Sequence, residues 1–198
     1  MNPARREVLA SLFERLYGGP VIRNDLRGEL VEEIGGMALV PDWSLCGSDW
    51  GACDLRDHNS GLRIQVKQSA ARQSWLSGKS GYGPPRYSIA AKTGFFEGAD
   101  WIAGHGRNAE IFIFAWHDVT GDECDHAEPE QWRFYVVAEA DLPAQKSFGL
   151  RQITRLAVAV DFSGLKDAIG VMKNQILSNA SSARSRVAGS VNSSSLNT

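Results

Sequence analysis

The segment from Leu62 to Gln68 constrains the fold of this chain more than any other part of the sequence. Its apolar and polar side chains alternate strictly, which is the pattern of a β-strand with one buried face. The apolar face carries Leu62, Ile64 and Val66, and the polar face carries Arg63, Gln65 and Lys67. Because side chains two residues apart point the same way along a strand, Gln65 and Lys67 are predicted to lie side by side. The polar face of this strand is therefore where chemistry is expected.

Helical and extended patterns alternate along the rest of the chain. Apolar residues recur at helical spacing over residues 4–17 and 25–39, and further helices are expected over residues 70–76 and 163–177. Other strands are expected over residues 43–46, 52–56, 111–116, 132–138 and 156–160. Residues 111–116 are apolar throughout, which is typical of a buried central strand. This order predicts an α/β (α+β) fold, in which helices flank a mixed central sheet.

The chain is long enough for one domain, and its composition changes near the C-terminus. Residues 178–198 contain eight serines and almost no large apolar side chain. We expect a single domain over residues 1–177 and a disordered Ser-rich tail over residues 178–198.

Two features favour a cytoplasmic protein without a membrane partner. No apolar run approaches the roughly 20 residues of a membrane helix, and the N-terminal segment lacks the apolar stretch of a secretory signal.

The three cysteines, Cys46, Cys53 and Cys124, do not form a disulfide framework. Cys124 and His126 lie two residues apart, but no second Cys or His pair has zinc-ligand spacing, so the sequence does not predict a zinc site. His117 is expected to be a structural histidine.

Charge is distributed unevenly, although the net charge is only −2. Residues 58–96 contain no Asp or Glu, and their bases are Arg63, Lys67, Arg72, Lys79, Arg86 and Lys92. Residues 97–141 contain eleven acids and two bases. A basic segment of this kind can contact a phosphate backbone, and it can equally be an ordinary solvated surface.

One group of polar residues is expected to meet at the edge of the sheet. Asp54 lies near the end of one predicted strand, and a short turn connects that strand to the one with Gln65 and Lys67. Glu32 or Glu29, from the preceding helix, can approach the same point. Mg²⁺ prefers oxygen ligands, a bound cation acidifies water and polarises a phosphoryl oxygen, and a lysine stabilises charge on phosphate. The pattern therefore points to metal-dependent phosphodiester hydrolysis.

The segment Asp54…Gln65-Val66-Lys67 resembles the signature of the PD-(D/E)xK nuclease superfamily. In addition, Gly28-Glu29-Leu30-Val31-Glu32 is similar to the Gly-x-x-x-Glu helix of Mrr-type restriction endonucleases and archaeal Holliday-junction resolvases. The resemblance covers about residues 25–117 and implies a restriction endonuclease-like fold. In that fold a helix with a glutamate precedes a three-stranded meander, a crossover helix and a fourth strand. Gln65 replaces the usual acid before x-Lys, as in Mrr-type members.

By this resemblance Glu32, Asp54, Gln65 and Lys67 are catalytic, with Glu29 as the second choice for the helix glutamate. Glu32, Asp54 and Gln65 would hold Mg²⁺ or Mn²⁺, and Lys67 would orient the attacking water or balance charge on the phosphate. The implied activity is a metal-dependent DNA endonuclease that works in restriction, phage defence or repair. A homodimer would let such an enzyme cut both strands.

The candidate nucleic-acid-binding residues lie in the segment without acids and are Arg72, Lys79, Tyr82 and Arg86. Tyr82 can stack on an unpaired base, whereas Arg72 can either hold a phosphate or lie on a solvated helix face. Two other functions stay open. Gln65 motivates a catalytically inactive DNA-binding module on the same fold. A small-molecule enzyme of unrelated fold would instead use Asp54 and Lys67 as a surface ion pair.

Overall fold

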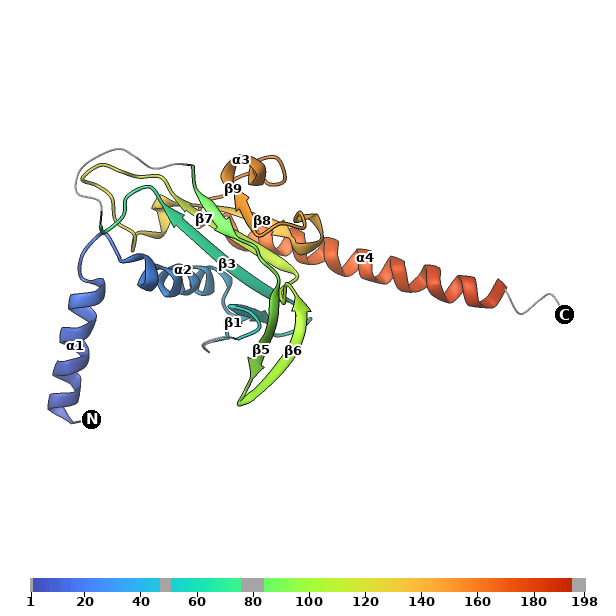
Figure 1. The fold of residues 1–198 in the computed structure, drawn as a ribbon, viewed down its shortest axis with the longest axis horizontal. Helices are drawn as coiled ribbons and strands as arrows, with labels where there is room; N and C mark the ends of the chain where they lie inside the picture. The colour runs from blue at the N-terminus through green and yellow to red at the C-terminus, as the bar shows by residue number, and fades with distance from the viewer. Residues whose placement is uncertain (1, 47–50, 76–83, 194–198) are drawn as a thin grey trace.

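The computed structural model of the protein describes residues 2–46, 51–75 and 84–193 and shows a mixed five-stranded sheet with helices around it (Figure 1). The helices are α1 (Pro3–Tyr17), α2 (Asn24–Leu39), α3 (Leu150–Ile153) and α4 (Leu165–Ser193), with 3-10 helices η1 (Pro129–Gln131) and η2 (Glu139–Asp141). The strands are β1 (Trp43–Leu45), β2 (Leu55–Asp57), β3 (Arg63–Ala70), β4 (Arg86–Ser88), β5 (Lys92–Glu97), β6 (Asp100–Gly106), β7 (Ile111–His117), β8 (Trp132–Ala138) and β9 (Ser147–Gly149). The α/β (α+β) class predicted from the sequence is confirmed. Within these ranges no helix combines the length and the apolarity that crossing a membrane requires.

The central sheet has the strand order β1-β2-β3-β7-β8. The first three strands form an antiparallel meander, β7 runs parallel to β3, and β8 runs antiparallel to β7. In the register of β3 and β7, Gln65 lies beside Phe112 and Lys67 lies beside Phe114. The tight turn between β2 and β3 uses Gly61, whose φ of 72° is a backbone conformation that a side chain disfavours. The meander predicted around the candidate site is therefore present.

Apolar layers pack against both faces of this sheet. On one face, α2 and α4 contribute to a core cluster with Ile64 and Val66 of β3. On the other face, the β4–β9 pair and α3 contribute to a second cluster with Phe112 and Phe114 of β7. Coverage of both faces explains why β7 is apolar along nearly its whole length, as a buried central strand must be.

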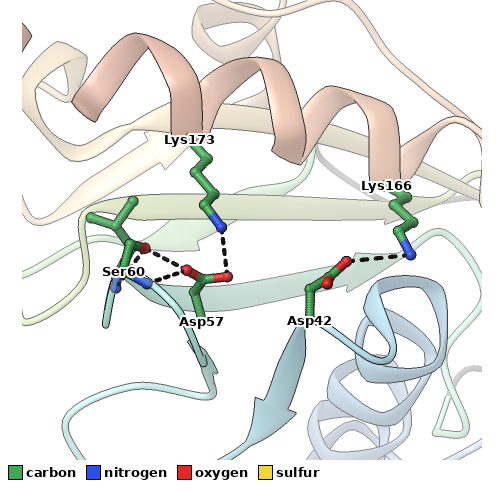
Figure 2. A network of polar contacts seen from close by, with 6 residues as sticks. Asp42, Asp57, Ser60, Lys166 and Lys173 are labelled. Carbon is green, nitrogen blue, oxygen red and sulfur yellow. Dashed lines mark hydrogen bonds and ion pairs between the residues drawn. The ribbon is translucent and has the colours of Figure 1, made fainter. Parts of the chain in front are cut away.

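Helix α4 is tied to the meander by two ion pairs (Figure 2). Lys173 Nζ lies 2.8 Å from Oδ1 of Asp57 at the end of β2, and Lys166 Nζ lies 3.5 Å from Oδ2 of Asp42 before β1. The buried Asp57 carboxylate also accepts hydrogen bonds from the backbone N and the Oγ of Ser60. These contacts fix the meander that carries the candidate site against the helix layer.

Two expected elements are replaced by other structure. The helix expected over residues 70–76 is wrong for the part that the structure describes, because β3 continues to Ala70, paired with His117 of β7, and residues 71–75 form bends and turns. Pairing with a buried strand here outweighs local helix propensity. The strand expected over residues 156–160 is also wrong: turns and irregular chain follow α3, with one isolated bridge from Val160 to Phe134.

The C-terminal helix is longer than the sequence predicts. A helix is expected over residues 163–177 and disorder over residues 178–198, whereas α4 continues to Ser193 and runs past the end of the sheet (Figure 1). Disorder is therefore the wrong prediction for residues 178–193. Alanines such as Ala180 and Ala183 have high helix propensity, which favours continuation of the helix beyond residue 177. Residues 194–198 lie outside the described residues.

The connection from β3 to β7 departs from the crossover helix that the resemblance implies. Its described residues, 71–75 and 84–110, contain no helix and instead form β4 and the β5–β6 hairpin. Helix α1 matches the helix expected over residues 4–17, but none of its side chains is buried. Val8 and Phe13 are each 65% exposed. The amphipathic pattern therefore predicts the helix correctly, but the apolar face of the helix is not buried.

Candidate functional site

Asp54 and Gln65 meet in the meander, as the alternation and the turn predict. Asp54 directly precedes β2, and its backbone is bound into the sheet through hydrogen bonds with Ile64 and Cys46. Its Oδ2 atom accepts a hydrogen bond from the backbone N of Val66 at 2.6 Å and another from Nε2 of Gln65. Two donors on one oxygen hold this half-buried carboxylate in a single orientation against β3.

Lys67 lies on β3, two residues after Gln65, and its side chain is half-buried. Burial lowers the pKa of Lys67, while the negative charges of Asp54 and Glu32 act in the opposite direction. The ammonium is thus close enough to sense both carboxylates. Within the described residues it forms no direct ion pair with either, so the surface ion pair of Asp54 and Lys67 expected for an unrelated small-molecule enzyme is not found.

Glu32 on α2 completes the group from the helix side. Burial raises the pKa of Glu32 to about 7, with further contributions from the charges of Asp54 and Glu29. Burial also raises the pKa of Asp54 above its ordinary value. Of the two glutamates considered from the sequence, Glu32 is half-buried and Glu29 is exposed. The structure therefore brings Glu32 into the group, with Glu29 one helical turn away on the same side of α2.

The donor atoms of this group suit a hard divalent cation. The charge of Asp54 raises the pKa of Glu32, and a positive charge near both carboxylates stabilises their ionised forms. Among the described residues, Oδ1 of Asp54 makes no hydrogen bond, since both donors contact Oδ2. The carboxylate of Glu32, Oδ1 of Asp54 and the amide oxygen of Gln65 are the oxygen ligands that Mg²⁺ and Mn²⁺ accept. Because Nε2 of Gln65 donates to Asp54, the amide must turn before its oxygen can join this set, and in that arrangement the residues present fit such an ion.

Lys92 belongs to the site and was not among the predicted site residues. It lies at the start of β5, is exposed, and its positive charge contributes to lowering the pKa of Glu32, Asp54 and Lys67 alike. The sequence feature that could have pointed to Lys92 is its position in the basic segment over residues 58–96. Nothing in the local pattern indicates that a strand distant in sequence returns to the meander.

The predicted nucleic-acid-binding residues are dispersed. Arg86 is exposed on β4. Arg72 is half-buried, and its Nη1 donates to the backbone oxygen of Gly121 at 2.7 Å, which fixes the guanidinium against the acidic loop 118–130. Lys79 and Tyr82 lie outside the described residues. Binding of nucleic acid by these four side chains stays a prediction.

Comparisons of the chain with protein-family models, with curated proteins and with solved structures found no match.

Proposed function

We propose that this protein is a Mg²⁺- or Mn²⁺-dependent endonuclease that hydrolyses phosphodiester bonds in DNA. The observation that carries the proposal is the hydrogen bond between Gln65 and Asp54, with Glu32 and the half-buried Lys67 near enough for their charges to shift each other's pKa. These residues come from α2, from the chain just before β2 and from β3, and the charges of Glu32, Asp54 and Lys67 act on one another's pKa. A restriction, phage-defence or repair role is part of the same proposal.

The order of elements around this group supports the proposal. A helix with Glu32 precedes the β1-β2-β3 meander with Asp54, Gln65 and Lys67, and β7 then pairs in parallel with β3. That is the arrangement expected from the resemblance to PD-(D/E)xK nucleases, apart from the strands that occupy the described part of the crossover. A parallel partner beside β3 keeps Gln65 and Lys67 on a rigid central strand, which favours fixed catalytic geometry.

Each residue has a definite task in this proposal. Glu32, Asp54 and Gln65 would hold the cation, which supplies Lewis-acid activation of a phosphoryl oxygen and acidifies its bound water. Lys67 places a positive charge where negative charge develops on the phosphate, in surroundings that water screens weakly. The exposed base Lys92, whose charge acts on the group, would contact a backbone phosphate near the scissile one, and the exposed Arg86 on β4 is a further candidate for a phosphate contact.

Assembly and location belong to the proposal as well. A homodimer would supply two such sites for the two strands of a duplex. A cytoplasmic location agrees with three free cysteines, because disulfides are rare in that compartment.

The test is cleavage of supercoiled plasmid by the purified full-length chain with Mg²⁺, with Mn²⁺ and with EDTA. Cleavage is expected only with a divalent cation, and Lys67→Ala and Asp54→Asn are expected to abolish it. Lys146→Ala removes an exposed lysine outside the site and serves as the matched control. Undiminished cutting by folded Lys67→Ala protein would contradict the proposal.

A second candidate function is a DNA-binding module without catalysis. It is favoured by the hydrogen bond from Gln65 to Asp54, because an amide that donates to the carboxylate turns its nitrogen, not its oxygen, toward it. Salt-dependent DNA binding with no cleavage under any divalent cation would support this alternative.

A further inference from the structure

A second group of metal-ligating side chains lies at the carboxyl end of β7. His117 ends β7, and Cys124 and His126 lie in the loop 118–130 that follows. All three are buried, and one ligand atom from each lies within 4.8 Å of the other two. The sequence did not predict this group, because His117 is separated from the other two and the spacing matches no common zinc motif.

The backbone of Arg72 lies near His126 and the side chain of Gln131 lies near His117, yet two buried ring nitrogens of the group form no hydrogen bond of normal geometry. They are Nδ1 of His117 and Nε2 of His126. Both imidazoles are fully buried, at 0% exposure. Buried polar atoms are nearly always paired, so two orphans in one place call for a ligand.

The other ring nitrogen of His117 fixes its tautomer. Nε2 lies 3.1 Å from the backbone oxygen of Asp125, and because a carbonyl only accepts, Nε2 carries the proton. The unpartnered Nδ1 therefore presents a lone pair. Metal-bound histidines commonly have this arrangement, in which the second nitrogen donates to a carbonyl and orients the ring.

His126 and Cys124 supply the remaining ligands. Nδ1 of His126 accepts a hydrogen bond from the backbone N of Ile22 at 3.0 Å, so coordination through Nε2 would shift the ring proton and displace this contact. Cys124 is 1% exposed. Burial raises the pKa of the Cys124 thiol, and the positive charge of Arg72 beside it acts in the opposite direction.

We propose that His117, Cys124 and His126 bind a zinc-class transition-metal ion that fastens the acidic loop to the end of β7. Two imidazoles and a thiolate select such an ion over Mg²⁺. Ligand atoms around tetrahedral zinc lie about 3.5 Å apart, so side-chain movements of about 1 Å complete the set. Trp132 of β8 packs edge-on against His117 and donates Nε1–H to the backbone oxygen of His126 at 2.9 Å, which holds the two histidines beside each other. This proposal does not depend on the proposed nuclease activity.

Metal-free full-length protein titrated with Co²⁺ and Zn²⁺ tests the site. One equivalent of Co²⁺ is expected to bind with a thiolate charge-transfer band and the ligand-field bands of tetrahedral cobalt, and Zn²⁺ is expected to displace it. X-ray absorption of the zinc protein is expected to give one sulfur at about 2.3 Å and two imidazole nitrogens at about 2.0–2.1 Å. A zinc coordination shell without sulfur, or the absence of any bound ion, overturns the proposal. The two buried ring nitrogens would then be explained by a direct or water-bridged contact between the two histidines.

Matched variants assign the ligands. Cys124→Ser and His126→Ala are expected to lose the cobalt bands and the zinc-dependent rise in unfolding temperature. Cys46→Ser and His58→Ala change residues of the same types outside the group and are expected to retain both. Asp54→Asn, at the proposed nuclease site, is also expected to retain zinc, so failure of either proposal can be recognised separately. Unchanged zinc affinity in Cys124→Ser overturns the assignment, and the spectra of the wild-type chain decide the matter if that variant does not fold.

Discussion

Gln65 decides how strongly the candidate site can hold a cation. Its amide donates to Oδ2 of Asp54, so a bound ion requires the amide to turn its oxygen inward. Gln65→Glu replaces this neutral ligand with a carboxylate. We expect the Mg²⁺ concentration for half-maximal cleavage to fall by about tenfold, because charged oxygen ligands bind hard cations more tightly.

The same variant should lose stability when no cation is present. The introduced carboxylate would face Asp54 without the hydrogen bond, and a lost buried hydrogen bond with added like-charge repulsion costs about 1–3 kcal/mol. Urea unfolding in EDTA measures that loss, and cleavage at varied Mg²⁺ measures the affinity. An unchanged Mg²⁺ requirement would show that position 65 does not contact the ion.

Glu32 gives the site a defined pH dependence. Its pKa is about 7 in the folded protein, while an unfolded glutamate titrates near about 4.3. The folded state therefore binds more protons between these values, and the free energy of unfolding contributed by Glu32 falls as pH rises through that window. Glu32→Gln should raise stability at pH 8 by about 1–3 kcal/mol, discounted for partial exposure, and change little below about pH 4.5.

Denaturant unfolding in EDTA, at pH 8 and at a pH below about 4.5, measures this effect of Glu32→Gln on stability. Glu33→Gln, one residue along the same helix and exposed, is the control and should shift stability little at either pH. An equal effect of Glu32→Gln at both pH values would mean that folding does not raise the pKa of Glu32.

At the level of elements, the contact between α4 and the meander contributes measurably to stability. Asp57 is 1% exposed and is held by Lys173 and Ser60, whereas the pair of Lys166 and Asp42 is about half exposed (Figure 2). Lys173→Met leaves a buried carboxylate without its cation and should cost about 3–5 kcal/mol. Lys166→Met, on the same helix, should cost less than about 1 kcal/mol.

The pH dependence of this contact has the opposite sign to that of Glu32. Burial alone would raise the pKa of Asp57, but the hydrogen bonds from Lys173 and Ser60 prevail and lower it. The stabilisation is therefore present above about pH 4 and is lost as pH falls through the folded pKa. Urea unfolding of both lysine variants at pH 7 and at pH 3 measures it, and equal losses in the two variants would refute the distinction.

The sequence predicts elements whose determinants are local. The bounds of β8 match, and the pairing of Asp54 with Gln65 follows from a period of two and one turn. Elements that depend on distant pairing are not predicted, as with β4, which pairs with β9. Lys92 shares that limitation, since it acquires its neighbours only when a distant segment packs beside it. His117 lies close in sequence to Cys124 and His126, but their spacing matches no common zinc motif.

For the whole molecule, a net charge of −2 means that any attraction to DNA must come from local clusters of bases. Lys92 beside the carboxylates and Arg86 on β4 are exposed and are the candidates that the structure describes. Each phosphate contact contributes roughly −0.9 to the slope of log affinity against log salt concentration. Lys92→Gln and Arg86→Gln should each weaken binding and make that slope less negative by roughly 1, irrespective of DNA sequence. Filter binding in EDTA over a range of salt concentrations measures the slope without cleavage. Lys146→Gln should leave it unchanged, and an equal change in all three variants would mean that the molecule meets DNA through diffuse charge and not through Lys92 and Arg86.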